Sequence, residues 1–232
     1  MYRLGMDQSK NIAWGVRREP CVLTAKEGFK RHDAGLYRFF GEAQDWVMQN
    51  TTLQALMRFK YFMMKDTPSL PRPGCDSQRN WNTCGFFLRT RTTADLLGEP
   101  AAEGIHQDGV EFTMTTMFNS NNMRKDSAVS TLYNLNQEIG VQHHEADPNN
   151  IIEAVQHLNY LDTLLFVDNE LSHSVTPVYQ NNPRVEANRD MGVFFTRRMA
   201  KKGGGFSAEP FDSESSHPTL PAAFSTGSKF LS

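Results

Sequence analysis

The segment GIHQDGVEFTMTTMF, residues 104–118, contains the pattern that decides the predicted fold. From Val110 onward, apolar residues alternate with glutamate and threonine, which is the two-residue repeat of a half-buried strand. His106 and Asp108 lie two residues apart just before it, and they share its buried face unless Gly109 marks a bulge. An imidazole and a carboxylate inside a barrel are costly unless something binds them. The segment therefore predicts a strand whose entrance carries two ligands of a metal site.

The rest of the chain predicts an α+β protein. Apolar residues recur at helical spacing over about residues 22–66, after a capping box that begins at Thr24, and we expect the aromatic and methionine side chains of this layer to be core residues. Three later runs predict strands, at residues 164–167, 172–178 and 189–197. Residues 147–158 fit either a short helix or a strand. A helical layer followed by strands that pair antiparallel predicts a sandwich or a double-stranded jelly roll.

The composition predicts one soluble domain. The 232 residues and the net charge of −2 give no case for a nucleic-acid partner or an anionic membrane. The first ten residues lack the apolar core of a signal peptide, no apolar run is long enough for a membrane span, and the three cysteines have no metal-knuckle spacing. We therefore expect a cytoplasmic protein with reduced thiols, with one domain over residues 1–200, its jelly-roll core over about 80–200, and a flexible tail over 201–232.

The third metal ligand is predicted at His173, in the segment DNELSHSVTPV at residues 168–178. Two neutral imidazoles and one carboxylate form the facial triad of non-haem iron(II) oxygenases, which leaves three adjacent coordination positions open. A His-x-Asp or His-x-Glu pair alone is a weak signal, because the chain contains a second such pair, His-His-Glu at residues 143–145. The combination of His106, Asp108 and a distant histidine on another strand is stronger.

A basic residue that enters a further strand completes the pattern. Arg189 suits a co-substrate with a second carboxylate, because guanidinium binds carboxylate through two hydrogen bonds and stays charged when buried. The alternative for Arg189 is an exposed ion pair with Asp190 or Glu186. Thr176 lies three residues past His173 and can hydrogen-bond the co-substrate, although a threonine that only favours strand structure is an equal alternative. The competing basic residues are Arg184, Arg197 and Arg198.

The segments AEGIHQDGVEFTMTTMFNSNNM (102–123) and LDTLLFVDNELSHSVTPV (161–178) resemble the iron(II)/2-oxoglutarate-dependent dioxygenases, closest to the branch typified by bacterial isoleucine dioxygenase. The resemblance covers roughly residues 80–197. It departs from the usual pattern in the serines on both sides of His173 and in the loop before Arg189. The positions that match the motifs of that family are Glu103, Gly104, His106, Asp108, Gly109, Asn122, Asp168, Asn169, His173, Val175, Thr176 and Pro177.

The resemblance implies a double-stranded β-helix with His106, Asp108 and His173 as catalytic iron ligands, and with Arg189 as the 2-oxoglutarate anchor. It implies Fe(II), 2-oxoglutarate and O2 as cofactor and co-substrates, with ascorbate as reductant. The implied reaction oxidises an aliphatic C–H bond of a free amino acid such as isoleucine, valine or leucine. Hydroxylation is one outcome, and closure of a C–N ring, which on valine gives an aziridine, is the other.

Several points stay open at this stage. Arg89 or Arg91 can bind the substrate carboxylate and Glu103 its ammonium group, with surface ion pairs as the alternative for each. An apolar wall for the substrate can come from Phe86, Phe87, Phe112 or Met114, with core packing as the alternative. Two other functions compete with the dioxygenase: a zinc-dependent hydrolase that uses the same triad, and a non-catalytic jelly-roll binding module.

Overall fold

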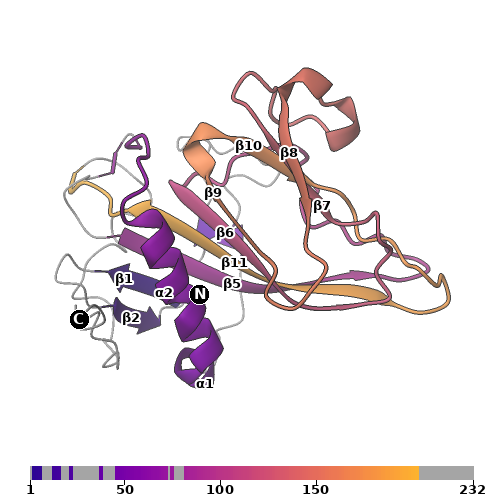
Figure 1. The fold of residues 1–232 in the computed structure, drawn as a ribbon, viewed down its shortest axis with the longest axis horizontal. Coiled ribbons are helices and arrows are strands. Elements are labelled where there is room, and N and C mark those ends of the chain that lie inside the picture. The colour runs from indigo at the N-terminus through magenta and orange to yellow at the C-terminus, as the bar shows by residue number, and fades with distance from the viewer. Residues whose placement is uncertain are drawn as a thin grey trace, which may run out of the picture.

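Antiparallel sheets and two helices make up the described part of the chain in the computed structural model (Figure 1). The structure describes residues 2–6, 12–16, 21–22, 37–38, 45–72, 74–75 and 81–203. The strands are β1 (Tyr2–Met6), β2 (Ile12–Val16), β3 (Cys21–Val22), β4 (Tyr37–Arg38), β5 (Trp81–Thr92), β6 (Phe112–Asn121), β7 (Val129–Tyr133), β8 (Ile151–Gln156), β9 (Thr163–Val167), β10 (Ser172–Val175) and β11 (Ala187–Arg198). The helices are α1 (Asp45–Gln49) and α2 (Thr51–Met64), with short 3₁₀ turns η2 (His143–Glu145), η3 (Pro148–Asn150) and η4 (Asp168–Glu170).

Two sheets hold the site between them. The larger sheet has the strand order β2-β1-β5-β11-β6-β9, and the smaller sheet has the order β10-β7-β8. An isolated antiparallel bridge between His106 and His173 adds one more short segment beside β10. From β5 onward the chain passes repeatedly between the two sheets, as in a jelly roll, while β7 and β8 are consecutive strands of the smaller sheet. The predicted mostly antiparallel β architecture is confirmed at this level.

Helix α2 covers the outer face of the larger sheet. Asn50 caps its first turn, since the Asn50 side chain accepts hydrogen bonds from the Thr52 and Leu53 N–H groups at 3.0 and 3.1 Å. The buried stripe of α2 packs against side chains of β5, β6 and β11. The residues of this shared core are Leu53, Leu56, Met57, Met64, Trp81, Phe112, Met114 and Phe194. No helix among the described residues is long and apolar enough to cross a membrane.

The predicted helical layer is correct for residues 45–64 and wrong where the structure places β3 and β4 within or at the edge of it. Cys21 pairs with Arg38 and Val22 with Tyr37, so these residues form a two-stranded ladder instead of a helix. The hairpin β1–β2, which pairs with β5, was not predicted either. The capping box at Thr24 and most of the proposed tail, from residue 204 onward, lie outside the described residues.

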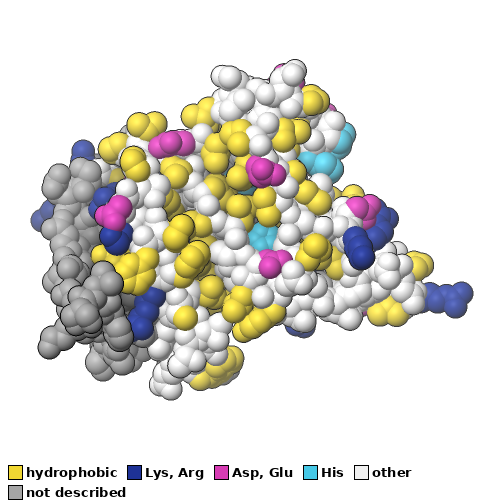
Figure 2. Space-filling view, in the orientation of Figure 1, with side chains coloured by type: hydrophobic (Ala, Val, Ile, Leu, Met, Phe, Trp, Pro, Cys, Tyr) yellow, Lys and Arg dark blue, Asp and Glu magenta, His cyan; other side chains and the backbone are white. Residues whose placement is uncertain are grey.

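The expectation that the apolar side chains of the helical layer are all core residues is wrong. Trp46 is 62% exposed, Phe59 is 45% exposed and Met63 is 52% exposed, and Figure 2 shows apolar side chains on the surface in the region of α2. For Phe59 and Met63 the reason is that another stripe of α2 already fills the contact with the sheet, so their side of the helix points away from it.

The strands predicted from sequence periodicity are confirmed. The runs at 164–167 and 189–197 correspond to β9 and β11, and the run after Val110 corresponds to β6. The run at 172–178 is a strand only over β10, which ends at Val175. Residues 147–158, for which a short helix and a strand were both possible, contain a short 3₁₀ turn followed by a strand. Asp147 caps the 3₁₀ turn η3, because its carboxylate accepts from Asn149 N–H at 2.9 Å, and the chain then continues as strand β8.

Lys60 is a buried lysine in the contact between α2 and the sheet. Its side chain lies in the core with 2% exposure, and its Nζ donates a hydrogen bond to the Phe194 carbonyl oxygen at 2.6 Å. Burial lowers the pKa of Lys60 well below its ordinary value. The unfolded chain therefore binds more protons than the folded chain below the ordinary lysine pKa, so the Lys60 contribution to stability rises with pH.

We expect the stability difference between Lys60→Met and the wild type to depend on pH. The free energy of unfolding of the variant minus that of the wild type should fall by up to about 1.4 kcal/mol per pH unit from pH 7 to 9, because only the wild type gains stability as the amine loses its proton. Urea unfolding at three pH values measures this difference. Lys65→Met is the control and should show no such slope, since the amine of Lys65 lies at the surface beside Asp66 and its pKa is raised. A difference that is constant with pH for Lys60→Met would contradict the assignment.

Candidate metal centre

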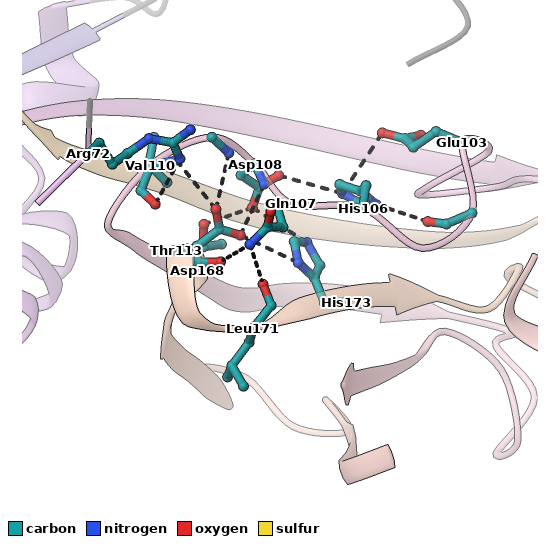
Figure 3. A network of polar contacts seen from close by, with 12 residues as sticks. Arg72, Glu103, His106, Gln107, Asp108, Val110, Thr113, Asp168, Leu171 and His173 are labelled. Atoms are coloured by element: carbon teal, nitrogen blue, oxygen red, sulfur yellow. Dashed lines mark hydrogen bonds and ion pairs between the residues drawn. The ribbon is translucent and has the colours of Figure 1, made fainter. Parts of the chain in front are cut away.

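The structure brings His106, Asp108 and His173 together in a buried cluster (Figure 3). One nitrogen or oxygen of each residue lies within 4.8 Å of those of the other two, and this is the only such group of histidine, cysteine and acidic residues in the described part of the chain. The His106 Nε2 atom is 3.6 Å from Asp108 Oδ1, and the His173 Nε2 atom is 3.5 Å from Asp108 Oδ2. Both Nε2 atoms therefore turn toward the same carboxylate, as ligands of one ion would.

The backbone bridge between the two histidines sets this geometry. The His106 N–H donates to the His173 carbonyl oxygen at 2.9 Å, and the His173 N–H donates to the His106 carbonyl oxygen at 2.8 Å. The two imidazole centroids are consequently only 4.2 Å apart. Residues directly opposite each other in an antiparallel ladder point to the same face, so the bridge aims both rings into the space between the sheets.

The ring of His106 is oriented by a glycine. The His106 Nδ1 atom lies 2.9 Å from the Gly104 carbonyl oxygen, which fixes Nδ1 as the donor and leaves Nε2 to face Asp108. Gly104 has a φ of 77°, and a Cβ at this position would lie 2.2 Å from the Val141 carbonyl oxygen. Any other residue at position 104 would therefore displace the turn that supports His106.

The predicted face of strand β6 is wrong, and Gly109 is the reason. Gly109 has a φ of 79°, so the chain turns between Asp108 and the start of β6 at Phe112. Thr113 is the residue that faces the site, because its hydroxyl donates to Asp108 Oδ2 at 2.7 Å. Phe112 and Met114 lie on the opposite face, in the core under α2. The condition attached to the sequence prediction, that Gly109 marks no bulge, is not met.

Asp168, the first residue of η4, links the two segments that carry the triad. Its Oδ1 accepts from the Asp108 N–H at 3.0 Å, and its Oδ2 accepts from the Gly109 and Val110 N–H groups at 3.1 and 3.3 Å. The Asp168 Oδ1 atom also lies 3.5 Å from His173 Nδ1. Gln107 braces the same turn, since its Nε2 donates to the carbonyl oxygens of Asp168 and Leu171 at 3.1 and 3.0 Å.

The electrostatics of the cluster follow from burial and proximity. Burial alone would lower the pKa of His106, but the contacts with Asp108 outweigh it and raise that pKa to about 9. Burial and then the charge of His106 lower the pKa of His173 to about 4. Burial opposes ionisation of Asp108, yet the two imidazoles and Thr113 lower its pKa overall. Burial and then the charge of Asp108 raise the pKa of Asp168 to about 8. The imidazoles and carboxylates are thus strongly coupled, and a metal cation bound there would take the place of the proton on His106.

Arg189 is buried rather than exposed. It is 4% exposed, its Nε has no hydrogen-bond partner among the described residues, and burial lowers its pKa to about 10. The ion pairs considered as the alternative involve other residues, because Asp190 binds Arg89 and Glu186 binds Arg91. The predicted exposed alternative for Arg189 is therefore wrong.

Strand β11 places Arg189 on the same face as the triad. Phe195 lies directly opposite Thr113 in the sheet, and Thr113 contacts Asp108. Arg189 is an even number of residues from Phe195 along β11, so the two side chains point to the same face. A buried guanidinium thus lies on the same inner face as the triad, as an anchor for the far carboxylate of a dicarboxylate would.

The predicted substrate arginines do not lie on this face. Arg89 makes two hydrogen bonds to Asp190 at 2.6 and 2.7 Å, and Arg91 pairs with Glu186. Both arginine side chains are more than half exposed. They form the surface ion pairs that were the alternative. Glu103 does lie at the cluster, with its Oε1 3.9 Å from His106 Nε2 and a side chain only 6% exposed.

The apolar wall of the site is built from other aromatics than most of those predicted. Phe166 lies opposite Thr113, and its ring centroid is 5.0 Å from that of His173. Phe86 contacts Phe195 with 5.6 Å between ring centroids, so it is the one predicted wall residue that lies on the inner face. Phe87, by contrast, contacts Phe118 and Phe194, and these rings lie on the outer face of the sheet beside the α2 core.

Thr176 and the second histidine pair have other surroundings. The Thr176 hydroxyl accepts a hydrogen bond from the Val129 N–H at 2.9 Å. His143 and His144 lie in the turn η2, where no residue is buried, and form no metal-type group with described neighbours.

Comparisons with known proteins agree with this geometry. Residues 16–195 match a family described as 2OG-Fe dioxygenase. The chain belongs to this family. The predicted enzyme class, an Fe(II)/2-oxoglutarate-dependent dioxygenase, is thereby confirmed. The donor set of the cluster also fits the implied metal, because two imidazoles and one carboxylate that face one point suit non-haem iron(II).

The individual relatives differ in sequence identity and in how much of each chain is covered. The chain is 41% identical to the bifunctional enzyme flvA of Aspergillus flavus over 206 residues, which are 88% of the chain but 25% of flvA. It thus spans about a quarter of that relative. Its structure is similar to that of the Fe(II)/(alpha)ketoglutarate-dependent dioxygenase TqaL, with a TM-score of 0.70, 37% identity and coverage of 87% of this chain and 66% of TqaL. IDO from Bacillus thuringiensis shares the fold, with a TM-score of 0.55, 18% identity and coverage of 73% of each chain.

Asp168, Thr113 and Gln107 were not assigned a role from the sequence. Asp168 follows the apolar run of β9 and precedes His173 by one short turn, and this position was the available signal. The role of Thr113 was hidden, because the turn at Gly109 reverses the face on which it points.

Metal binding should release protons near neutral pH. The pKa of His106 is raised to about 9, so its imidazole carries a proton at pH 7 that must leave before Nε2 can bind a metal. We expect release of at least one proton per metal ion at pH 7 and a release that approaches zero above pH 9, with affinity that rises with pH over this range. Calorimetric titration with Co(II) in buffers of different ionisation enthalpy measures the number. Proton release that is absent at pH 7 would contradict the predicted state of His106.

Proposed function

We propose that this chain is an oxygenase in which His106, Asp108 and His173 hold iron(II) and Arg189 anchors 2-oxoglutarate. The observation that carries the proposal is the arrangement of a two-histidine, one-carboxylate cluster and a buried arginine on one inner face. When bound, the iron and co-substrate supply the oxidising power, because decarboxylation of 2-oxoglutarate and reduction of O2 are coupled there. The protein residues fix geometry and exclude water.

We further propose that the two sheets are the double-stranded β-helix of the family. The alternation of strands between the sheets supports this, since β5, β11, β6 and β9 are neighbours in one sheet. The segment around His106 and strands β10, β7 and β8 are neighbours in the other. The proposal extends to one dioxygenase domain over residues 1–200.

The inner face assigns roles to its own side chains. Arg189 has two terminal nitrogens in a planar fork that match a carboxylate, and burial strengthens that contact. Thr113 holds one oxygen of Asp108, which leaves the other to face the metal position. Thr176 remains a proposed co-substrate contact, because its hydroxyl accepts from Val129 N–H and still has a proton to donate.

The proposed substrate is a free aliphatic amino acid, as in the branch typified by isoleucine dioxygenase. Glu103 supports this choice, because a buried carboxylate 3.9 Å from His106 Nε2 suits an ammonium group at the metal. Phe86, Phe166 and Phe195 supply apolar surface for an aliphatic side chain. The substrate loses two hydrogens to ring closure with water as co-product, or gains one oxygen atom. In both cases O2 and 2-oxoglutarate become succinate and carbon dioxide, with ascorbate to keep the iron reduced.

The two competing functions each leave one observed feature without a role. A zinc-dependent hydrolase with the same triad gives no role to the buried Arg189, and a non-catalytic binding module gives no role to the three aligned metal ligands. We also propose a small-molecule partner and a cytoplasmic location.

A substrate panel tests the proposed reaction. Purified protein with Fe(II), ascorbate and 2-oxoglutarate should release succinate in the presence of one or more of isoleucine, valine and leucine, because the substrate completes the site. Mass spectrometry of the amino acid then distinguishes a gain of one oxygen from a loss of two hydrogens. Succinate that stays at background for every member, under conditions where Fe(II) binds, would refute the amino acid substrate.

Arg189→Met tests the co-substrate anchor. We expect the KM for 2-oxoglutarate to rise on the order of 100-fold, since loss of one partner of a buried charge pair costs several kcal/mol. The KM for the amino acid should change far less. The matched control is Arg91→Met, which removes an arginine from the neighbouring strand β5 whose charge is paired with Glu186 at the surface. An equal effect of both substitutions would show that Arg189 acts only through stability.

A further inference from the structure

Asp168 contacts the segments of two triad residues without being a member of the triad. Its side chain is completely buried, and its two oxygens accept hydrogen bonds from three successive N–H groups, of Asp108, Gly109 and Val110. Figure 3 shows this carboxylate between the turn at Asp108 and the ring of His173. It belongs to the turn η4 that leads directly into β10, the strand of His173.

The first consequence is that the position of Asp108 depends on Asp168. Residues 108–111 belong to no regular strand, so their N–H groups need acceptors from elsewhere. A buried side chain whose two oxygens accept hydrogen bonds from three N–H groups fixes such a turn, because losing an acceptor would leave buried N–H groups unpaired. On the other side of the turn, Arg72 donates to the Val110 carbonyl oxygen at 3.3 Å. The carboxylate of Asp108 is thereby held toward the two imidazoles.

The second consequence concerns His173. Its Nε2 faces Asp108 at 3.5 Å, and its buried Nδ1 makes no hydrogen bond among the described residues but lies 3.5 Å from Asp168 Oδ1, close enough for a small shift to form one. A proton held on Nδ1 by this carboxylate leaves the Nε2 lone pair free for a metal. His106 is supported differently, because its Nδ1 faces the neutral carbonyl of Gly104 at 2.9 Å.

We propose that Asp168 is a positioning residue of the metal centre, which fixes the turn of Asp108 and holds the proton of His173 on Nδ1. It is not a ligand, since its oxygens are engaged by the turn. The inference rests on the proposed iron site and adds a residue that determines its affinity. The two histidines would accordingly differ in basicity toward the metal, because only His173 has a carboxylate behind it.

The test is the affinity of the full chain for Co(II), used as a spectroscopic probe for the iron position. Asp168→Asn keeps the shape of the side chain but replaces one acceptor oxygen by a donor, which cannot accept from the backbone N–H groups. We expect the dissociation constant to rise about 10- to 100-fold. Asp162→Asn is the matched control, because the Asp162 carboxylate also accepts backbone N–H groups, of Leu158 and Asn159 at 2.8 and 2.7 Å, but contacts no triad residue. It should change the dissociation constant less than twofold.

A second measurement separates positioning from general loss of stability. Proton NMR of the Co(II)-loaded wild type should show two strongly shifted exchangeable imidazole protons, one from each histidine. Asp168→Asn should shift one of them or accelerate its exchange, and leave the other unchanged. If Asp168→Asn binds Co(II) as the wild type does and both resonances are unaltered, the proposal is wrong. A wild type that binds no Co(II) would instead refute the metal centre itself.

The wild type also provides a test if Asp168→Asn does not fold. With Zn(II) bound, the His173 Nδ1 proton should be shifted downfield and protected from exchange at pH 7, as expected for a hydrogen bond to a carboxylate. Complete loss of that resonance to exchange with water would overturn the role of Asp168.

Discussion

The antiparallel bridge between His106 and His173 is the interaction on which the rest of the site depends. Two backbone hydrogen bonds join segments that are far apart in the sequence and bring two imidazoles within 4.2 Å of each other. Neither segment can form the cluster alone, because His106 belongs to the approach to β6 and His173 to β10. The two imidazoles therefore come together only when the segment before β6 pairs with β10.

Burial makes this arrangement costly until a cation is present. Two carboxylates and two imidazoles lie in one desolvated cluster, where burial raises the pKa of each carboxyl and lowers that of each imidazole before the neighbouring charges act. A bound dication balances these charges, so part of its binding free energy becomes stability of the fold. Burial likewise disfavours the charge of the Arg189 guanidinium, and a bound anion would offset that cost.

Local signals in the sequence predicted the ligands and most of the strands around them. The spacing of His106 and Asp108, the apolar run of β9 and the alternation in β11 depend only on near neighbours, and all three are observed. What failed depends on contacts between distant segments. The face of β6 was misjudged because one positive φ at Gly109 shifts the parity of everything after it.

Contacts between distant segments also explain the other differences between the prediction and the structure. The hairpin β1–β2 is defined by its pairing with β5, which no pattern within residues 2–16 reveals. Arg89 and Arg91 resembled substrate ligands in sequence, but the register of β5 against β11 pairs them with Asp190 and Glu186 instead. Asp168 acts through backbone groups of another segment, and such contacts leave no periodic signal.

Strand β11 carries charges of opposite sign at adjacent positions, Arg189 toward the interior and Asp190 toward the surface. Because successive side chains of a strand alternate, displacement of this strand by a single residue would put an anion where the guanidinium lies. The interior would then repel dicarboxylates rather than attract them. Strand β11 is hydrogen-bonded on both edges, to β5 and to β6, and this makes such a displacement unfavourable. The central location of β11 therefore also keeps the guanidinium, and not the carboxylate, on the inner face.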